Sequence, residues 1–179
     1  MSDWIKWLAP PAIVFAGTGS CLAVEYLTLE HAQKLMFPDA TFFESAQVTL
    51  TPEQARTVEK RTGVRMHSLE LRVWRATAED KIIGYFVLDD VVGKHELINF
   101  VLALDPKGTV RQLEVLNYRE AYGYEIRNPA WRKQFVGKVL TDPVRLDEDI
   151  RNISGATLSC RHVTDGVRRT LGIFDVAIK

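Results

Sequence analysis

A short string of hydroxyl and small residues, Ser154-Gly155-Ala156-Thr157, stands just before the most regular helical pattern in the sequence, over residues 158–171. The simplest interpretation is a helix cap, in which Ser154 or Thr157 accepts a hydrogen bond from a free backbone N–H. A helix N-terminus also attracts anions such as phosphate. The string therefore predicts either a helix cap or an anion site.

Other signatures of chemistry are missing from the sequence. No GxGxxG, GxxxxGK[ST] or GxSxG motif occurs, which removes the usual marks of dinucleotide, triphosphate and α/β-hydrolase sites. We expect no metal, because the histidines and cysteines are widely separated: His31, His67, His95, His162, Cys21 and Cys160. The acidic run Asp147-Glu148-Asp149 is interpreted as an exposed loop rather than a cation site.

The expected secondary structure places several strands in succession, with helices at both ends. This order predicts an α+β fold with a mainly antiparallel sheet and flanking helices. Helices are expected over residues 27–36, 52–62, 131–135 and 158–171, and strands over 47–50, 69–74, 82–88, 97–104 and 110–116. Thr51 and Gln54 form a capping-box pattern with Pro52 in the first turn. Asp105-Pro106-Lys107-Gly108 predicts a hairpin turn between two of the strands.

Composition and charge are those of an ordinary globular protein. The 179 residues include 23 basic and 23 acidic side chains, with 46% hydrophobic and 26% charged residues. This length favours one main domain. The zero net charge argues against a polycation that binds nucleic acid through counterion release, so we expect no nucleic-acid partner.

The N-terminal segment differs from the rest, because Asp3 and Lys6 are its only charges before Glu25. Residues 1–23 are interpreted as a secretory signal cleaved after Ala23 or as an uncleaved membrane anchor. A lipoprotein signal ending at Cys21 and a plain N-terminal helix are the remaining alternatives. A signal or an anchor would place the rest of the chain in the periplasm or another extracytoplasmic compartment.

Several motifs occur in a fixed order and together resemble a known family. After the apolar strand come Asp105-Pro106-Lys107-Gly108, Glu120-Ala121-Tyr122-Gly123, Phe135-Val136-Gly137-Lys138 and finally Ser154-Gly155-Ala156-Thr157. This order resembles the FMN-binding domain family, which includes the flavin-carrying subunits of the sodium-pumping NADH:quinone reductase and of the Rnf complex. The resemblance covers roughly residues 82–171, so we expect an N-terminal segment over 24–80, packed on an FMN-binding domain over 81–179.

The resemblance implies a flavoprotein electron carrier with FMN attached to Thr157 through a phosphoester, installed by a flavin transferase. It implies membrane or periplasmic redox proteins as partners. The residues expected at the cofactor are Thr157, Ser154, Gly155, Ala156, Leu158, Ser159, Glu120, Tyr122 and Gly123. Among the aromatic residues Tyr118, Tyr122, Tyr124 and Trp131, each is expected either to line the flavin or to pack in the core. Glu120 either bonds the cofactor or caps a turn.

The chain departs from the family pattern at three positions. Arg151 stands where the family often has an aspartate, and Ala121 and Tyr122 replace threonine and proline. Two alternative functions therefore remain: an FMN-dependent reductase of a small extracytoplasmic acceptor, and a flavin-free binding or assembly module of the same fold. The sequence does not decide whether the chain is an enzyme in its own right.

Overall fold

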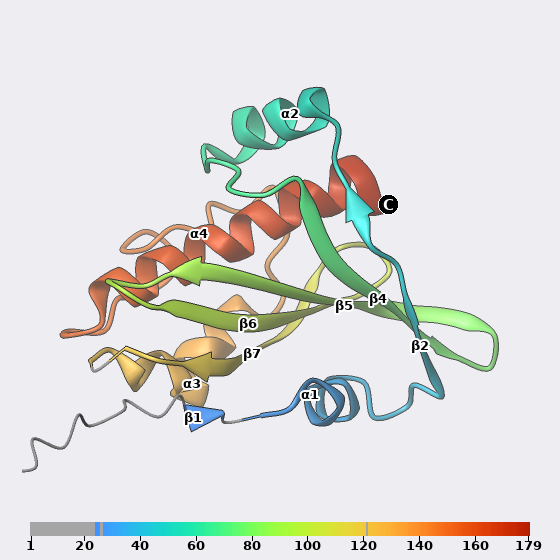
Figure 1. The fold of residues 1–179 in the computed structure, drawn as a ribbon, viewed down its shortest axis with the longest axis horizontal. Helices are drawn as coiled ribbons and strands as arrows, with labels where there is room; N and C mark the ends of the chain where they lie inside the picture. The colour runs from blue at the N-terminus through green and yellow to red at the C-terminus, as the bar shows by residue number, and fades with distance from the viewer. Residues whose placement is uncertain (1–23, 26, 121) are drawn as a thin grey trace, which may run out of the picture.

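In the computed structural model, the described residues are 24–25, 27–120 and 122–179. The expected signal or anchor at residues 1–23, and Ala121, lie outside them. Within the described ranges, seven strands form one antiparallel sheet in the order β1-β7-β6-β5-β4-β2, with β3 also paired to β4 (Figure 1). The expected α+β fold with a mainly antiparallel sheet is therefore confirmed.

The strands are β1 (Val24–Glu25), β2 (Phe42–Ser45), β3 (Val48–Thr49), β4 (Glu70–Ala78), β5 (Lys81–Val92), β6 (Leu97–Leu104) and β7 (Val110–Tyr118). The α-helices are α1 (Leu29–Met36), α2 (Pro52–Thr62), α3 (Pro129–Arg132) and α4 (Thr157–Ile173). Short 3-10 turns cover Tyr124–Arg127 and Lys133–Phe135, and a π-helical turn over Phe174–Ile178 follows α4.

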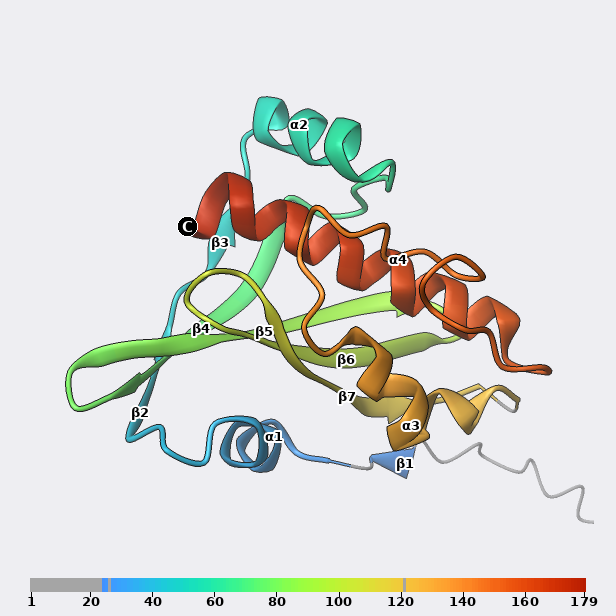
Figure 2. The same cartoon turned by 180° about the vertical axis from the view of Figure 1, so that it is seen from behind.

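Helices cover both faces of the sheet, so its central strands are buried on two sides. Along β6, Phe100 and Leu102 pack in the core under α4, whereas Val101 and Ala103 pack with residues of α1. Figure 2 shows α4 on one face of the sheet and α1 on the other. Burial on both faces explains why β6 appears in the sequence as an almost continuous apolar run.

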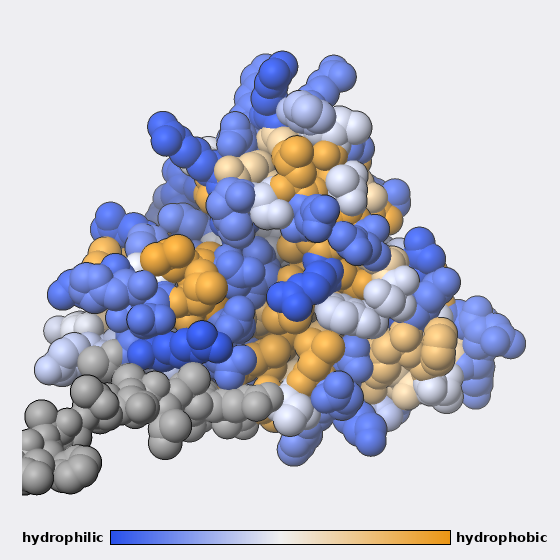
Figure 3. All heavy atoms as spheres, in the orientation of Figure 1, coloured by the Kyte–Doolittle hydropathy of each residue, from blue (hydrophilic) through white to orange (hydrophobic). Residues whose placement is uncertain are grey.

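The long helix α4 lies close against the sheet because it has a glycine at the contact. A Cβ atom on Gly166 would lie 2.8 Å from Cζ of Phe100. Helix α2 packs on α4 on the side away from the sheet, and its outer side is hydrophilic (Figures 1 and 3). The layers are therefore α2, α4, the sheet and α1.

Local signals predicted helix α2 almost residue for residue. Thr51 and Gln54 make both bonds of the capping box, and Gly63 ends the helix with a φ of 69°. A left-handed residue is the usual way to end a helix, and glycine adopts it without steric strain.

Strand β5 is longer than expected, because it continues past residue 88 to Val92. The extra residues include Asp89, whose charge disfavours a buried strand. Asp89 stays in the strand because Arg169 of α4 pairs with it at 2.7 Å. Strand β2 was not expected at all, and it forms through pairing with β4. No helix in the described ranges is long and apolar enough to cross a bilayer.

Candidate functional site

The predicted site begins at the N-terminus of α4. Thr157 is the first residue of the helix, and Ala156 is its N-cap. No side chain caps this end, so the interpretation of Ser154 or Thr157 as a cap is wrong. The first N–H groups of a helix have no partner inside it. The start of α4 therefore offers backbone donors and a partial positive charge to an anion.

A pocket of about 390 Å³ opens at this helix end. Its volume is within the range of about 300–1,000 Å³ that is common for small-molecule sites. The pocket is lined by Lys94, His95, Glu120, Tyr122, Gly155, Ala156, Thr157, Leu158 and Ser159. The structure thus brings most of the predicted site residues to one cavity, although the sequence separates them into two groups.

The hydroxyl of Thr157 is held by a neighbouring amide. Nδ2 of Asn152 donates a hydrogen bond of 3.1 Å to Oγ1 of Thr157. Oδ1 of Asn152 is buried and has no hydrogen-bond partner among the described residues. Asn152 therefore orients the hydroxyl and keeps an unused acceptor close to it.

Two of the expected residues do not line the pocket. Ser154 is exposed, and Gly123 lies behind the pocket wall. With a φ of 92°, Gly123 has a left-handed backbone, and a Cβ atom there would lie 2.5 Å from the Tyr118 hydroxyl and 2.9 Å from Oγ of Ser159. Gly123 therefore allows its loop to pack against the start of α4.

The wall behind the pocket is a small polar network. The Tyr118 hydroxyl lies 2.9 Å from Oγ of Ser159 and donates to the carbonyl oxygen of Tyr122. Burial raises the pKa of the Tyr118 hydroxyl, and this outweighs its hydrogen bond to Ser159. The phenol therefore stays protonated and links β7, the 122–124 loop and α4.

Glu120 was expected either to bond the cofactor or to cap a turn, and in the structure it caps a turn. Its Oε1 accepts hydrogen bonds from the backbone N–H groups of His95 at 2.5 Å and Glu96 at 3.0 Å. Desolvation raises the pKa of this carboxyl, but the hydrogen bonds from Glu96, His95 and Lys94 outweigh it, so the pKa lies below its usual value.

Sequence reasoning missed Lys94 and His95 as pocket residues. They lie in the turn between β5 and β6, in a stretch to which no structure was assigned. The register pairs Ile98 with Tyr118, so the antiparallel chains bring Glu120 opposite this turn. If the pairing of Ile98 with Tyr118 is extended by two residues, Glu96 lies opposite Glu120. The register of β6 and β7 would therefore have indicated the contact between Glu120 and the turn.

The four aromatic residues near the Glu120 motif divide into two groups. Tyr118 and Trp131 are buried in the core. Tyr122 and Tyr124 are 83% and 58% exposed, and Tyr122 lines the pocket. Tyr122 thus offers aromatic surface at the mouth of the pocket, where a planar ring could stack.

The segment before Thr157 is held in place from both sides. Nε1 of Trp131 donates to the carbonyl oxygen of Arg151 at 2.8 Å, and Oε1 of Gln134 accepts from the N–H of Arg151 at the same distance. The Arg151 side chain is exposed. The backbone is therefore fixed, while the arginine that replaces the family aspartate faces solvent.

Within the acidic run of residues 147–149, only Asp149 accepts hydrogen bonds that hold the loop together. Asp149 accepts hydrogen bonds from Nζ of Lys138 at 2.8 Å and from the N–H groups of Val144 and Arg145. Desolvation raises the pKa of the Asp149 carboxyl, but these bonds outweigh it and hold the pKa below its usual value. Asp147 and Glu148 are exposed, as expected for a loop.

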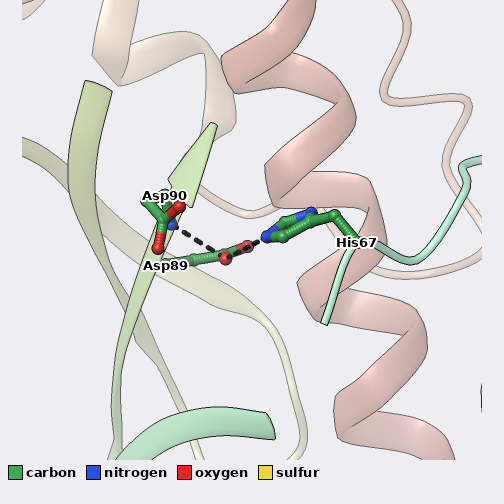
Figure 4. Close-up of side chains that lie close together, drawn as sticks. All are labelled: His67, Asp89 and Asp90. Atoms are coloured by element: carbon green, nitrogen blue, oxygen red, sulfur yellow. Dashed lines mark hydrogen bonds and ion pairs between the residues drawn. The ribbon is translucent and has the colours of Figure 1, made fainter. Parts of the chain in front are cut away.

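A second group of polar side chains lies away from the pocket, on β5 and before β4. His67, Asp89 and Asp90 have ligand atoms within 4.8 Å of one another (Figure 4). The charge of Asp89 is already compensated by Arg169, and its other oxygen accepts from the N–H of Asp90 at 2.9 Å. We interpret the buried ion pair of Asp89 and Arg169 as the contact that fixes α4 on the sheet, with His67 and Asp90 at its more exposed side.

The residues of the pocket fit a flavin nucleotide. The uncapped N-terminus of α4 suits a phosphate, and Gly155 leaves open space because nothing lies within 4 Å of the position of a Cβ atom. Exposed Leu158 and Tyr122 supply apolar surface for a ring. The pocket thus combines the uncapped N–H groups of α4, the hydroxyl of Thr157 and exposed apolar surface.

Comparison with known proteins agrees with this class of site. Residues 93–172 match the family model described as the FMN-binding domain, and they include all residues that line the pocket. The crystal structure of NqrC from Shewanella oneidensis has a similar fold, with a TM-score of 0.55 and 17% identity. The match covers 80% of this chain and 84% of that one. No curated protein sequence matches the chain.

The fold and the pocket define an α+β domain with a site that fits a flavin nucleotide. The resemblance expected from the ordered motifs is confirmed: residues 93–172 match the family model of the FMN-binding domain, and the fold is similar to that of NqrC.

Proposed function

We propose that this chain is an electron carrier with FMN covalently bound to Thr157 through a phosphoester bond. The observation that carries the proposal is the position of Thr157 at the uncapped start of α4, inside the pocket. When bound, the flavin supplies the redox chemistry, and the protein supplies binding, orientation and charge.

The residues of the chain divide the binding task. The first N–H groups of α4 would hold the phosphate, and Asn152 would orient the hydroxyl that accepts it. Tyr122 and Leu158 would pack on the ring, and Ser159 would fix the wall through Tyr118. Glu120 acts on the turn that carries Lys94 and His95 rather than on the cofactor.

Attachment is a group transfer that needs a second protein. Oγ of Thr157 forms a new bond to the phosphorus of a flavin dinucleotide, the bond from that phosphorus to the departing mononucleotide breaks, and the hydroxyl proton passes to a base. No acidic or histidine side chain of the described residues hydrogen-bonds Oγ1 of Thr157. We therefore propose that a flavin transferase supplies the base and the dinucleotide.

The proposed location is extracytoplasmic, with residues 1–23 as a cleaved signal or an anchor. Strand β1 begins at Val24 and pairs with Tyr118 at the edge of the sheet. Cleavage after Ala23 would retain both residues of the described strand β1. Sequencing the N-terminus of the exported protein distinguishes a cleaved signal from an anchor.

Acid precipitation of the protein co-expressed with a flavin transferase tests the attachment. We expect flavin absorbance to stay with the pellet for the wild type and for Thr157→Ser, and to be lost with Thr157→Ala. A colourless wild-type pellet would support the flavin-free module. Reoxidation of loaded protein by small acceptors, without a protein partner, would support the reductase.

A further inference from the structure

The turn between β5 and β6 forms one wall of the flavin pocket. Lys94 and His95 both line the pocket together with Thr157, although they lie more than 60 positions away in the sequence. Gly93 and Glu96 close the turn with a backbone hydrogen bond of 2.8 Å. The turn therefore brings two side chains that can carry positive charge to the site of an anionic cofactor.

Glu120 fixes this turn from the side of β7. Its Oε1 accepts from the N–H groups of His95 and Glu96, at 2.5 and 3.0 Å. The carboxylate approaches so closely that a Cβ atom on Gly93 would lie 2.7 Å from Oε1. Gly93 thus makes room for the carboxylate, and Glu120 clamps the backbone of the turn.

His162 fixes the same turn from α4. Its Nδ1 lies 2.5 Å from the carbonyl oxygen of Val92 and 3.1 Å from that of Gly93. Because a carbonyl oxygen only accepts, Nδ1 must carry the proton. The helix that presents Thr157 at its first residue therefore also holds the turn, which sets Lys94 and His95 in a fixed position relative to Thr157.

The charge of the wall follows from this arrangement. The Glu120 carboxylate is engaged by backbone N–H groups, whereas Nζ of Lys94 forms no ion pair with any described residue. Reduction adds negative charge to a flavin, and a nearby cation stabilises that charge.

We propose that Lys94, with His95 beside it, forms the cationic side of the flavin pocket and raises the midpoint potential of the bound FMN. Glu120 and His162 are positioning residues that act through the turn. This inference rests on the proposed function, because it requires FMN in the pocket.

Redox titration of FMN-loaded protein, followed by absorbance, tests the role of Lys94. Lys94→Gln should lower the midpoint potential, shifting the equilibrium toward oxidised flavin by roughly threefold to tenfold, and Lys94→Arg should keep the wild-type value. Lys107→Gln is the matched control, because Lys107 is exposed in the turn at the other end of β6. Equal potentials for Lys94→Gln and the control overturn the proposal.

The sign of a second change separates positioning from direct charge. If Glu120 acted only as a negative charge near the flavin, Glu120→Ala would raise the midpoint potential of the flavin. If Glu120 instead holds the turn, Glu120→Ala releases Lys94 and lowers the potential, as Lys94→Gln does. A rise in the potential of Glu120→Ala would overturn its role as a positioning residue.

A third measurement does not need the flavin. In the background of Thr157→Ala, hydrogen exchange of the His95 and Glu96 amides should be slow, and Glu120→Ala should make it at least tenfold faster. Unchanged exchange would overturn the clamp. Wild-type protein that takes up no FMN from an active transferase would refute the proposed function, whereas loaded protein with unaltered potentials would refute only this inference.

Discussion

The side-chain amide of Asn152 donates a hydrogen bond of 3.1 Å to the hydroxyl of Thr157, from a position five residues earlier in the chain. The bond points the hydroxyl in one direction before any modification occurs. Asn152 directly follows Arg151, the position where the family often has an aspartate.

Loss of this hydrogen bond should slow the attachment of FMN. We expect Asn152→Ala to lower the initial rate of flavin incorporation by up to about tenfold, the effect of one hydrogen bond. Asn152→Asp should retain more activity, because a carboxylate can accept the hydroxyl proton. In-gel flavin fluorescence over time measures the rate, with Ser45→Ala on β2 as an exposed control outside the motif. Wild-type incorporation by Asn152→Ala would contradict the role of the amide.

Gly123 should be sensitive to any side chain. Gly123→Ala combines a left-handed backbone with a contact of 2.5 Å to the Tyr118 hydroxyl, and we expect it to lower the free energy of unfolding by about 2–4 kcal/mol. Gly137→Ala is the matched control, since its φ is 84° but nothing lies within 4 Å of the added atom. Urea denaturation compares the two. An equal loss in both variants would show that the contact has no effect.

Asp149 should make the loop before the site sensitive to acid. Its folded pKa lies below the unfolded value of 3.8, so its contribution to stability is fully present above that value and is lost as the pH falls through the folded pKa. At pH 7, Asp149→Asn should lower the free energy of unfolding by about 1.5–3 kcal/mol, as expected for hydrogen bonds to a charged group.

The difference between Asp149→Asn and the wild type should shrink when denaturation is repeated below pH 3.8. Asp147→Asn provides the control, because Asp147 is exposed in the same loop. A constant difference across this pH range would mean that ionised Asp149 does not stabilise the loop.

Cys160 should be protected from alkylation in the folded protein. The thiol is buried in α4, and burial raises its pKa, so the reactive thiolate is scarce. We expect iodoacetamide at pH 8 to leave Cys160 unmodified in native protein and to modify it in urea, as measured by peptide mass. Equal modification rates in the two conditions would place the thiol at the surface.

Local sequence signals predicted the elements that depend on neighbours in the chain. The capping box of Thr51 and Gln54 marked the start of α2, and the apolar run from Leu97 to Leu104 coincides with β6. Each of these elements is specified by a few consecutive side chains, which is why the α+β class could be recognised before the structure.

The parts that the sequence did not predict depend on distant partners. Strand β2 exists through its pairing with β4, and Asp89 remains in β5 through its ion pair with Arg169, 80 positions later. Lys94 and His95 reach the pocket on a turn whose backbone is hydrogen-bonded to Glu120 and His162. Such contacts have no local pattern, so only the fold reveals them.

The central claim is that FMN is carried by the hydroxyl of Thr157. Trypsin cuts after Arg151 and Arg161, giving a peptide of residues 152–161 that holds three hydroxyl side chains, Ser154, Thr157 and Ser159. Fragmentation of this peptide by mass spectrometry, from protein co-expressed with a flavin transferase, should place one FMN on Thr157. An unmodified peptide, or FMN on Ser154 or Ser159, would contradict the account.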